Sequence, residues 1–331
     1  MNSEAPSARS TRRRHRPVLT AALTLPLLAV AACGSGSGPA TPSGTDRPSG
    51  PATSGGASGT PAPSASSPST APRTSPAPPA ASSTSGGTGT GTAATSVRTA
   101  VYFLHGEQVS PAPRTVTAPA TATGAVRALL AGPDTFERGH SRTTAIPAGT
   151  KLNSVVIRGR VATVDLSGRY DDGGGSLSMR ARLAQMVFTL TRLPAVDKVA
   201  FALDGKPVKH FGGEGVVLDG PVGRADFEDL APAVLMESPL IGDTVRTPLR
   251  VWGSADTFEA VFRLKVTDST GHTAADVRVT ATSGTGTRGT FDVTFPYKAA
   301  GSGPGRLTAY YLSPKDGRPV TVDTVPLTVN R

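Results

Sequence analysis

A long stretch of this chain has no side chain large enough to build a hydrophobic core. Residues 34–95 contain no Val, Leu, Ile, Met, Phe, Tyr or Trp, and consist of Gly, Ser, Thr, Pro and Ala with three charged residues. Burial of apolar groups must offset the entropy lost when a chain is ordered, so this composition predicts a disordered linker with a reach of roughly 40 Å. Folded domains are therefore expected only from residue 97 onward.

The amino-terminal residues are typical of an export signal that ends at a lipid attachment site. A basic cluster precedes an uncharged apolar run over 17–32, which is shorter than the roughly 18 to 20 residues that a membrane-spanning helix needs. Val30-Ala31-Ala32-Cys33 resembles the lipobox of bacterial lipoproteins. The resemblance implies that a signal peptidase recognises Val30, Ala31 and Ala32. It also implies that Cys33 carries acyl chains such as palmitate, which hold the protein on the extracytoplasmic face of the membrane.

Cys33 is the only cysteine in the chain, so no disulfide within it can stabilise the exported domains. An ordinary export signal with an incidental cysteine is the alternative to a lipid anchor. General secretion is favoured over the twin-arginine route because no apolar pair follows Arg13-Arg14.

The positive charge of the chain does not indicate a nucleic-acid partner. The formal net charge is +10, but residues 1–33 alone contribute five Arg against a single Glu. Basic residues in 96–331 are dispersed and nearly balanced by acidic ones, whereas a nucleic-acid footprint needs clustered Lys and Arg with stacking aromatics. A nucleic-acid partner is therefore excluded.

The segment 97–228 alternates strand and helix patterns. "RTAVYFL" (98–104) predicts a strand, "TGAVRALLAGP" (123–133) a helix, and "SVVIRGRVATVDLS" (154–167) a hairpin that turns at Gly159. A second helix is predicted from 176, capped by Ser176 or Ser178, and a strand with an Asp204-Gly205 turn follows it. The order β-α-β-β-α-β favours a two-layer α/β domain with helices on one face of a small sheet.

In the segment 230–331, apolar and polar residues alternate as in strands, and no helix pattern occurs. Seven short strand patterns, separated by Gly, Pro, Asp and Ser, predict an antiparallel β-sandwich. The only tryptophan, Trp252, is predicted to lie in its core, which requires a bulge at Gly253. The expected fold class is thus α+β, a two-layer α/β domain followed by an all-β immunoglobulin-like sandwich.

Both segments resemble known families. "AIPAGTKL", "ATVDLS" and "TLTRLPAVDKV" are similar to the GerMN domain of sporulation and spore-germination proteins. "ESPLIGDTV", "GTFDVTFPY" and "YLSPKDG" are similar to Gmad2, an immunoglobulin-like domain often found beside GerMN. The resemblance implies a non-catalytic role in envelope assemblies. GerMN domains also occur in lipoproteins of high-GC Gram-positive bacteria, and the use of 27 Arg against 7 Lys agrees with a high-GC coding sequence.

Candidate chemistry in the folded segments is sparse. Asp171-Asp172-Gly173 lacks the spaced carboxylates of a calcium loop and predicts a turn, and Asp165 predicts a polar strand position that caps a loop. No Gly-x-Ser-x-Gly elbow lies between a strand and a helix. Three arginines on the second helix could meet an acidic wall polymer, although a solvated face is favoured: Arg180, Arg182 and Arg192. The histidines lack metal-ligand spacing and are expected at the surface: His105, His140, His210 and His272.

These observations lead to one functional hypothesis. Residues 1–32 are expected to be a lipoprotein signal peptide, 33–96 the lipidated cysteine and linker, 97–228 a GerMN-like domain and 230–331 a Gmad2-like sandwich. The protein is expected to be a lipid-anchored, non-catalytic binding or scaffold protein without cofactor or metal, whose partners are the membrane and envelope proteins or a cell-wall polymer. The alternatives are a cell-wall-active enzyme and a solute-binding lipoprotein.

Overall fold

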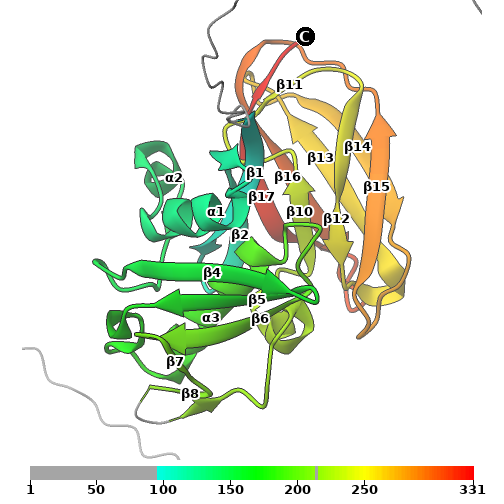
Figure 1. The fold of residues 1–331 in the computed structure, drawn as a ribbon. Helices are drawn as coiled ribbons and strands as arrows, with labels where there is room; N and C mark the ends of the chain where they lie inside the picture. Colours follow the sequence, from blue (N-terminus) through cyan, green and yellow to red (C-terminus); the bar gives the residue numbers. More distant parts are fainter. Residues whose placement is uncertain (1–94, 213–214) are drawn as a thin grey trace, which may run out of the picture. The chain divides into compact units, whose positions relative to one another are not determined.

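The computed structural model describes residues 95–212 and 215–331. These residues are mostly β-structure with a few helices (Figure 1). The predicted signal peptide, the lipidation site and nearly all of the predicted linker lie outside the described residues.

The first segment begins with a β-hairpin. Strand β1 (Thr95–His105) pairs antiparallel with β2 (Gln108–Ala118), and Gly106 turns the chain with a φ of 63°. The other edge of β1 pairs with β3 (Arg142–Thr143), giving the order β2-β1-β3. The predicted strand at 98–104 is confirmed.

Strand β2 is an element that the sequence does not predict. Pro111 and Pro113 interrupt its sequence, and proline has no N–H to donate to a neighbouring strand. β2 tolerates both because it lies at the edge of its sheet, where alternate N–H groups need no partner.

A second sheet follows, with the order β4-β5-β6-β7. The predicted hairpin is confirmed, since β4 (Leu152–Arg158) and β5 (Val161–Leu166) pair antiparallel around Gly159 and Arg160, whose φ angles are 53° and 64°. Strand β6 (Lys198–Leu203) lies parallel to β5 and turns through Asp204-Gly205 into β7 (Lys206–Pro207). The predicted tight turn is therefore also present.

The strands of the first segment form two main sheets and a two-stranded ribbon of 210–211 with 216–217, and not the one small sheet expected. The physical reason lies at the strand edges. β2 and β3 occupy both edges of β1, and β7 occupies the outer edge of β6, so no edge of β1 is left for β4 or β6. The element order also differs from β-α-β-β-α-β because β2 directly follows β1.

Both predicted helices are present. α1 (Thr121–Leu130) buries Ala125, Val126 and Leu129, and a short α2 (Thr135–Gly139) follows it. α3 (Ser176–Leu190) connects β5 to β6 and contacts α1 and β1, so most of its residues are buried. Figure 1 shows α3 behind β5 and β6.

The predicted cap of α3 is wrong. Gly175 is the N-cap residue, and no side chain makes a capping hydrogen bond there. Two glycines with positive φ, Gly173 and Gly174, bring the chain into the helix, so backbone conformation replaces a serine cap. Minor elements complete this segment: β8 (His210–Phe211), β9 (Val216–Val217), η1 (Gly168–Asp171) and η2 (Arg224–Leu230).

The second segment is built from two sheets that share a core. The three-stranded sheet has the order β10-β12-β15, with bounds Val234–Ser238, Leu249–Ala255 and Gly289–Phe295. The five-stranded sheet has the order β11-β17-β16-β13-β14, with bounds Thr244–Val245, Pro319–Val329, Gly303–Leu312, Val261–Thr267 and Thr273–Thr280. All seven predicted strands are present, and β11 is additional.

Aromatic packing joins the two sheets. Phe262 of β13 and Phe291 of β15 meet edge to face, with ring centroids 4.9 Å apart. Gly253 of β12 lets β10 approach closely, because a Cβ there would lie 2.0 Å from the Leu235 carbonyl oxygen. The bulge in this region lies in β10, between Met236 and Ser238, and not in β12 as the core placement of Trp252 required.

Candidate functional site

The predicted anchor residues Val30, Ala31, Ala32 and Cys33 lie outside the described residues, so the lipid attachment site stays a prediction. Within 95–212 and 215–331, no helix is both long and apolar enough to cross a membrane.

The four histidines of the folded segments are dispersed. All are exposed or half-buried, as expected, and two of them lie near a carboxylate. The Nδ1 atom of His105 is 3.9 Å from Asp323, and that of His272 is 3.7 Å from Asp268. Over the described part of the chain, no group of three or more His, Cys, Asp or Glu side chains is placed to hold a metal ion.

The acidic residues that the sequence analysis singled out accept hydrogen bonds from backbone N–H groups in loops and turns. The Asp165 carboxylate accepts a hydrogen bond from the Gly205 N–H at 3.0 Å and so fixes the β6–β7 turn. Asp171 ends η1 and accepts from the Gly212 N–H at 2.7 Å. Residues 171–173 form the end of η1 and a bend in place of the predicted turn, and Asp165 caps a loop, although the loop follows β6 and not β5.

The arginines of α3 form neither a polymer-binding row nor a solvated face. Arg182 is buried, and its guanidinium donates to the Tyr170 carbonyl oxygen at 2.8 Å. Arg180 donates to the Asp229 carboxylate at 2.6 Å and lies over the ring of Phe227 in η2. Both expectations fail because elements distant in sequence pack against this side of the helix.

The third arginine, Arg192, contacts the second segment. Its guanidinium carbon lies 4.4 Å from the ring centroid of Trp252, and its Nε lies 3.4 Å from a carboxylate oxygen of Glu237. Trp252 is half-buried on the opposite face of β12 from Val251, which is fully buried. The predicted core position of Trp252 is therefore wrong, because β12 has no bulge to shift its alternation.

A buried polar cluster joins the two segments. The Arg224 guanidinium donates to the buried Glu237 carboxylate and, at 3.2 Å, to the Tyr102 hydroxyl. Burial raises the pKa of the Tyr102 hydroxyl far above its usual value, so Tyr102 stays neutral. Arg142 adds a second link, donating to the Ser110 hydroxyl at 2.9 Å and to the Thr324 carbonyl oxygen at 3.3 Å. We call Tyr102, Arg192, Arg224, Glu237 and Trp252 the junction cluster.

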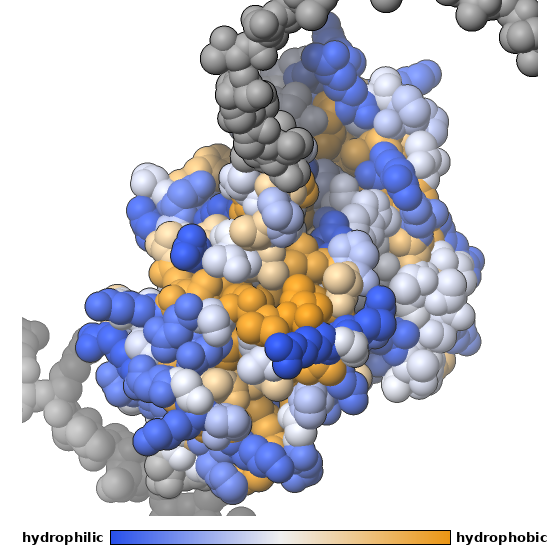
Figure 2. Space-filling model, viewed as in Figure 1, coloured by the Kyte–Doolittle hydropathy of each residue, from blue (hydrophilic) through white to orange (hydrophobic). Residues whose placement is uncertain are grey.

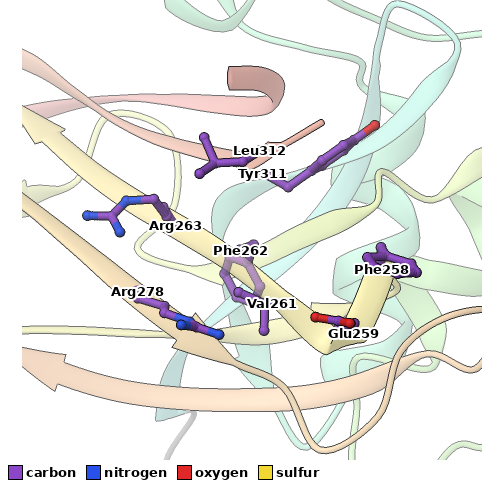
Figure 3. A pocket seen from close by; sticks show the side chains of 8 residues that line it. All are labelled: Phe258, Glu259, Val261, Phe262, Arg263, Arg278, Tyr311 and Leu312. Atoms are coloured by element: carbon purple, nitrogen blue, oxygen red, sulfur yellow. The ribbon is translucent and has the colours of Figure 1, made fainter. Parts of the chain in front are cut away.

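A small hollow lies where β13 begins and β16 ends (Figure 3). Its volume is about 290 Å³. We call it the β13–β16 hollow, and its lining consists of Phe258, Glu259, Val261, Phe262, Arg263, Arg278, Tyr311 and Leu312. Antiparallel pairing of β13 with β16 brings residues 258–263 close to 311–312, about fifty positions away in the sequence, and the pairing of β14 with β13 adds Arg278.

The rim of the hollow is apolar and open to solvent. Phe258 and Leu312 are 56% and 55% exposed, which is unusual for two large apolar side chains at one depression. In Figure 3 the ring of the buried Phe262 lies between Phe258 and the two arginines, and Leu312 lies on the same side as Arg263. The hollow can therefore take an apolar group from outside the chain.

Charged groups lie at the two ends of the hollow. Arg263 is occupied, because its Nε donates to Asp276 at 2.9 Å and to the Tyr310 hydroxyl at 3.0 Å. By contrast, among the residues that the structure describes, the Arg278 guanidinium and the Glu259 carboxylate have no hydrogen-bond or ion-pair partner. One cation and one anion thus remain available beside an apolar floor.

The loop that presents Phe258 has a strained backbone. Glu259 and Ala260 have φ angles of 54° and 57°, the left-handed region that side chains with a Cβ rarely adopt. Neighbours hold this conformation, since the Glu259 N–H donates to the Thr285 hydroxyl at 3.0 Å and the Ala281 N–H donates to the Ala260 carbonyl oxygen at 2.9 Å. Such strain persists only where the surroundings impose it, and it is frequent at binding sites.

The sequence does not reveal this hollow. Tyr311 and Leu312 belong to a strand-like pattern, in which large apolar residues indicate a core, and Phe258 directly precedes another such pattern. Only the register between β13 and β16 shows that they meet at an open end of the sheet.

Another apolar area lies on the first segment. Figure 2 shows hydrophobic surface gathered over β4 and towards α1. Val156 and Ile157 of β4 are 44% and 39% exposed there. β4 is also an edge strand of its sheet.

Two family models match the chain. Residues 100–209 match Germane, described as "Sporulation and spore germination". Residues 233–318 match Gmad2, described as "Immunoglobulin-like domain of bacterial spore germination". The two matches support the domain architecture expected from the sequence, and every residue of the β13–β16 hollow lies within the second match.

Solved structures also resemble parts of the chain. A putative lipoprotein from Clostridium perfringens is 21% identical over 41% of this chain and 93% of its own, with a TM-score of 0.30. The first GerMN domain of the sporulation protein GerM from Bacillus subtilis is 20% identical over 39% of this chain and 99% of its own, with a TM-score of 0.32. The tandem GerMN domains of the same protein are 16% identical over 56% and 60%, with a TM-score of 0.34. No curated protein matches the chain.

Proposed function

We propose that this chain is a lipid-anchored, extracytoplasmic binding or scaffold protein of the bacterial cell envelope that acts without catalysis and is linked to sporulation or germination. Two adjacent matches to families described by spore germination support this context. A fold does not dictate a role, so the argument for binding must come from the surface of the molecule.

The observation that carries the proposal is the junction cluster. A buried carboxylate, Glu237, faces the guanidinium groups of Arg192 and Arg224, and an exposed linker contact would not need such a desolvated arrangement. The cluster ties the first segment to the second beside β12. A pair of modules held in this way suits a protein that presents two surfaces to its partners.

The amino terminus supplies the anchor in this proposal. Acyl chains on Cys33 would hold the protein at the membrane, after recognition of Val30, Ala31 and Ala32 by the peptidase. The apolar-poor residues 34–95 would let the folded segments reach envelope proteins or wall polymer. A high-GC Gram-positive bacterium is the proposed host.

Cell fractionation tests the anchor. We expect the tagged full chain in the membrane fraction, accessible to protease added outside the cell, with diacylglyceryl on Cys33 in mass spectrometry. The Cys33→Ala variant should leave the membrane fraction. Recovery of the wild-type chain in the cytosol with residues 1–32 intact would contradict the proposal.

Crosslinking tests the role. In intact cells, the wild type should crosslink to envelope proteins or wall fragments, and Cys33→Ala should lose these products. Release of peptidoglycan fragments by the purified chain, abolished by one polar substitution, would instead establish a wall-active enzyme.

A further inference from the structure

The β13–β16 hollow combines an apolar floor with two unpaired opposite charges. We infer that it binds an extended segment of a partner protein that carries an acidic residue, a large apolar residue and a basic residue at alternate positions. This inference rests on the proposed binding role and specifies the partner that the second segment recognises.

The first step concerns the apolar group. Phe258 and Leu312 are more than half exposed, and both border a depression whose base includes the buried Phe262. Isolated exposed apolar residues are ordinary, but two that flank one concavity mark a binding surface. Its volume, about 290 Å³, matches a single large side chain and not a whole ligand.

The second step concerns the loop. Two consecutive residues, Glu259 and Ala260, hold left-handed φ angles, and bonds from Ala281 and to Thr285 keep them there. The folded chain therefore accepts a conformational free-energy cost at these two residues. The result is that the Phe258 side chain is exposed to solvent. A covering partner would recover the free energy of burying Phe258, which gives the strain a function.

The third step concerns charge. Glu259 precedes β13 and Arg278 lies opposite Arg263 in the β13–β14 register, so the two free charges flank the hollow at opposite ends. Only residues 261–263 of this stretch are extended, and Glu259 and Ala260 turn with left-handed φ angles, so the backbone from Glu259 to Arg263 spans less than the roughly 13 Å of four extended residues. The flexible Asp and Lys side chains at the ends of an extended partner cover that difference. In such a segment, residues i, i+2 and i+4 face the same side. A carboxylate at one end then meets Arg278 and a cation at the other meets Glu259.

Other occupants fit less well. Residues 34–95 of this chain offer no large apolar side chain, so the linker cannot fill the hollow. A lipid headgroup region would favour Arg278 but would be repelled by the free Glu259 carboxylate. A second copy of the chain is tested directly below.

Peptide binding to the purified full chain tests the inference. The probe is a fluorescently labelled heptapeptide, Ala-Asp-Ala-Phe-Ala-Lys-Ala, blocked at both ends and followed by fluorescence anisotropy. We expect saturable binding that weakens about tenfold in Phe258→Ala and in Leu312→Ala, as for central anchors of an interface. Leu177→Ala and Val217→Ala, which truncate equally exposed apolar residues elsewhere, should leave binding unchanged.

A charge swap tests the polarity. Arg278→Glu should weaken the Asp-containing peptide at least fivefold, and a peptide with Lys in place of Asp should bind Arg278→Glu better than wild type. Arg158→Glu, which reverses an exposed charge on β4, should change neither affinity. A peptide affinity that is unchanged by Phe258→Ala or by the charge swap would overturn the inference.

Two controls separate this inference from its alternatives and from the proposed function. Sedimentation that shows self-association abolished by Phe258→Ala would assign the hollow to a second copy. Co-sedimentation with phosphatidylglycerol vesicles that depends on Phe258 would assign it to the membrane. Either result would overturn the peptide inference. Absence of peptide binding, with Cys33-dependent fractionation intact, would remove this inference and leave the proposed anchoring in place.

Discussion

The guanidinium of Arg192 lies over the indole ring of Trp252, with 4.4 Å between the guanidinium carbon and the ring centroid. Arg192 follows α3 in the first segment, and Trp252 belongs to β12 in the second. The contact thus joins residues sixty positions apart and adds a cation–π interaction to the ion pairs on Glu237. Trp252 therefore belongs to the junction cluster and not to the core of the sandwich.

Arg192→Ala should loosen the junction. Loss of the cation–π contact is expected to lower the free energy of unfolding by about 1 kcal/mol and to expose the indole ring to water. Trp252 is the only tryptophan, so its fluorescence emission should shift to longer wavelength without a second signal. Arg158→Ala, at an exposed arginine of β4, is the control and should shift neither the emission nor the urea midpoint.

Glu237→Gln should lower the free energy of unfolding more than Arg192→Ala does. The carboxylate is buried and faces two arginines, so its neutralisation leaves both guanidinium groups without an opposite charge beside them. A loss of about 2 to 3 kcal/mol in unfolding free energy is expected, less than for a fully buried pair because Arg224 is partly exposed. Asp197→Asn, which breaks the exposed pair with Arg160, should change stability little. Equal urea midpoints for the two variants would contradict a structural role for the junction.

Gly253→Ala should disrupt the three-stranded sheet. The added Cβ would lie 2.0 Å from the Leu235 carbonyl oxygen, so β10 and β12 must separate. We expect a loss of about 3 kcal/mol or failure to fold, read from circular dichroism and thermal melting. Gly220→Ala has open space around its Cβ and should melt like the wild type. A Gly253→Ala protein of normal stability would show that the strands do not approach so closely.

We expect the Asp268 carboxyl to make the free energy of unfolding depend on pH. Burial alone would raise the pKa of this carboxyl, but hydrogen bonds from the Thr270 hydroxyl and from the backbone N–H groups of Ala300, Thr270 and Gly301 outweigh it and hold the pKa well below the usual value. A lowered folded-state pKa stabilises the protein above the unfolded pKa, near 4, and this stabilisation is lost as the pH falls through the folded pKa.

Urea titrations at a series of pH values check this dependence. The wild type should lose stability progressively below about pH 5. Asp268→Asn should be less stable at pH 7 and should lose less between pH 5 and pH 2, because it has no carboxyl to protonate. Parallel curves for both proteins would exclude Asp268 as the source.

Ala260→Gly should relieve the strained loop. Glycine adopts a positive φ without a steric cost, so the free energy of unfolding should rise by up to about 1 kcal/mol. Ala275→Gly, within strand β14, should lower it because glycine loses more entropy there. If both variants are destabilised alike, the left-handed conformation of Ala260 is not a source of strain.

Comparison of the predicted with the observed elements shows which local sequence signals were sufficient to predict turns and strands. Gly159 with Arg160 and Asp204 with Gly205 marked turns correctly, because tight turns depend on the φ preferences of a few adjacent residues. The strands of the second segment were found because alternation reports burial on one face. β2 was missed because Pro111 and Pro113 argue against a strand unless its edge position is known.

The positions of charged and aromatic side chains required the fold. Local periodicity assigns Arg182 of α3 and Arg192, just after α3, to solvent, yet Tyr170 and Trp252 lie against them. The hollow likewise depends on Phe258 and Leu312, whose proximity follows from strand register and not from spacing.

The sequence alone determined the two main helices, most of the strands, and that no disulfide within the chain can hold the folded segments together, because these follow from local composition and periodicity. Only the tertiary structure decided how strands are shared between sheets, that Trp252 and Glu237 join the two segments, and that an apolar hollow with opposite charges lies open. Those outcomes depend on contacts between residues far apart in the chain, and such contacts are fixed by packing and register, which leave no mark in any short stretch of sequence.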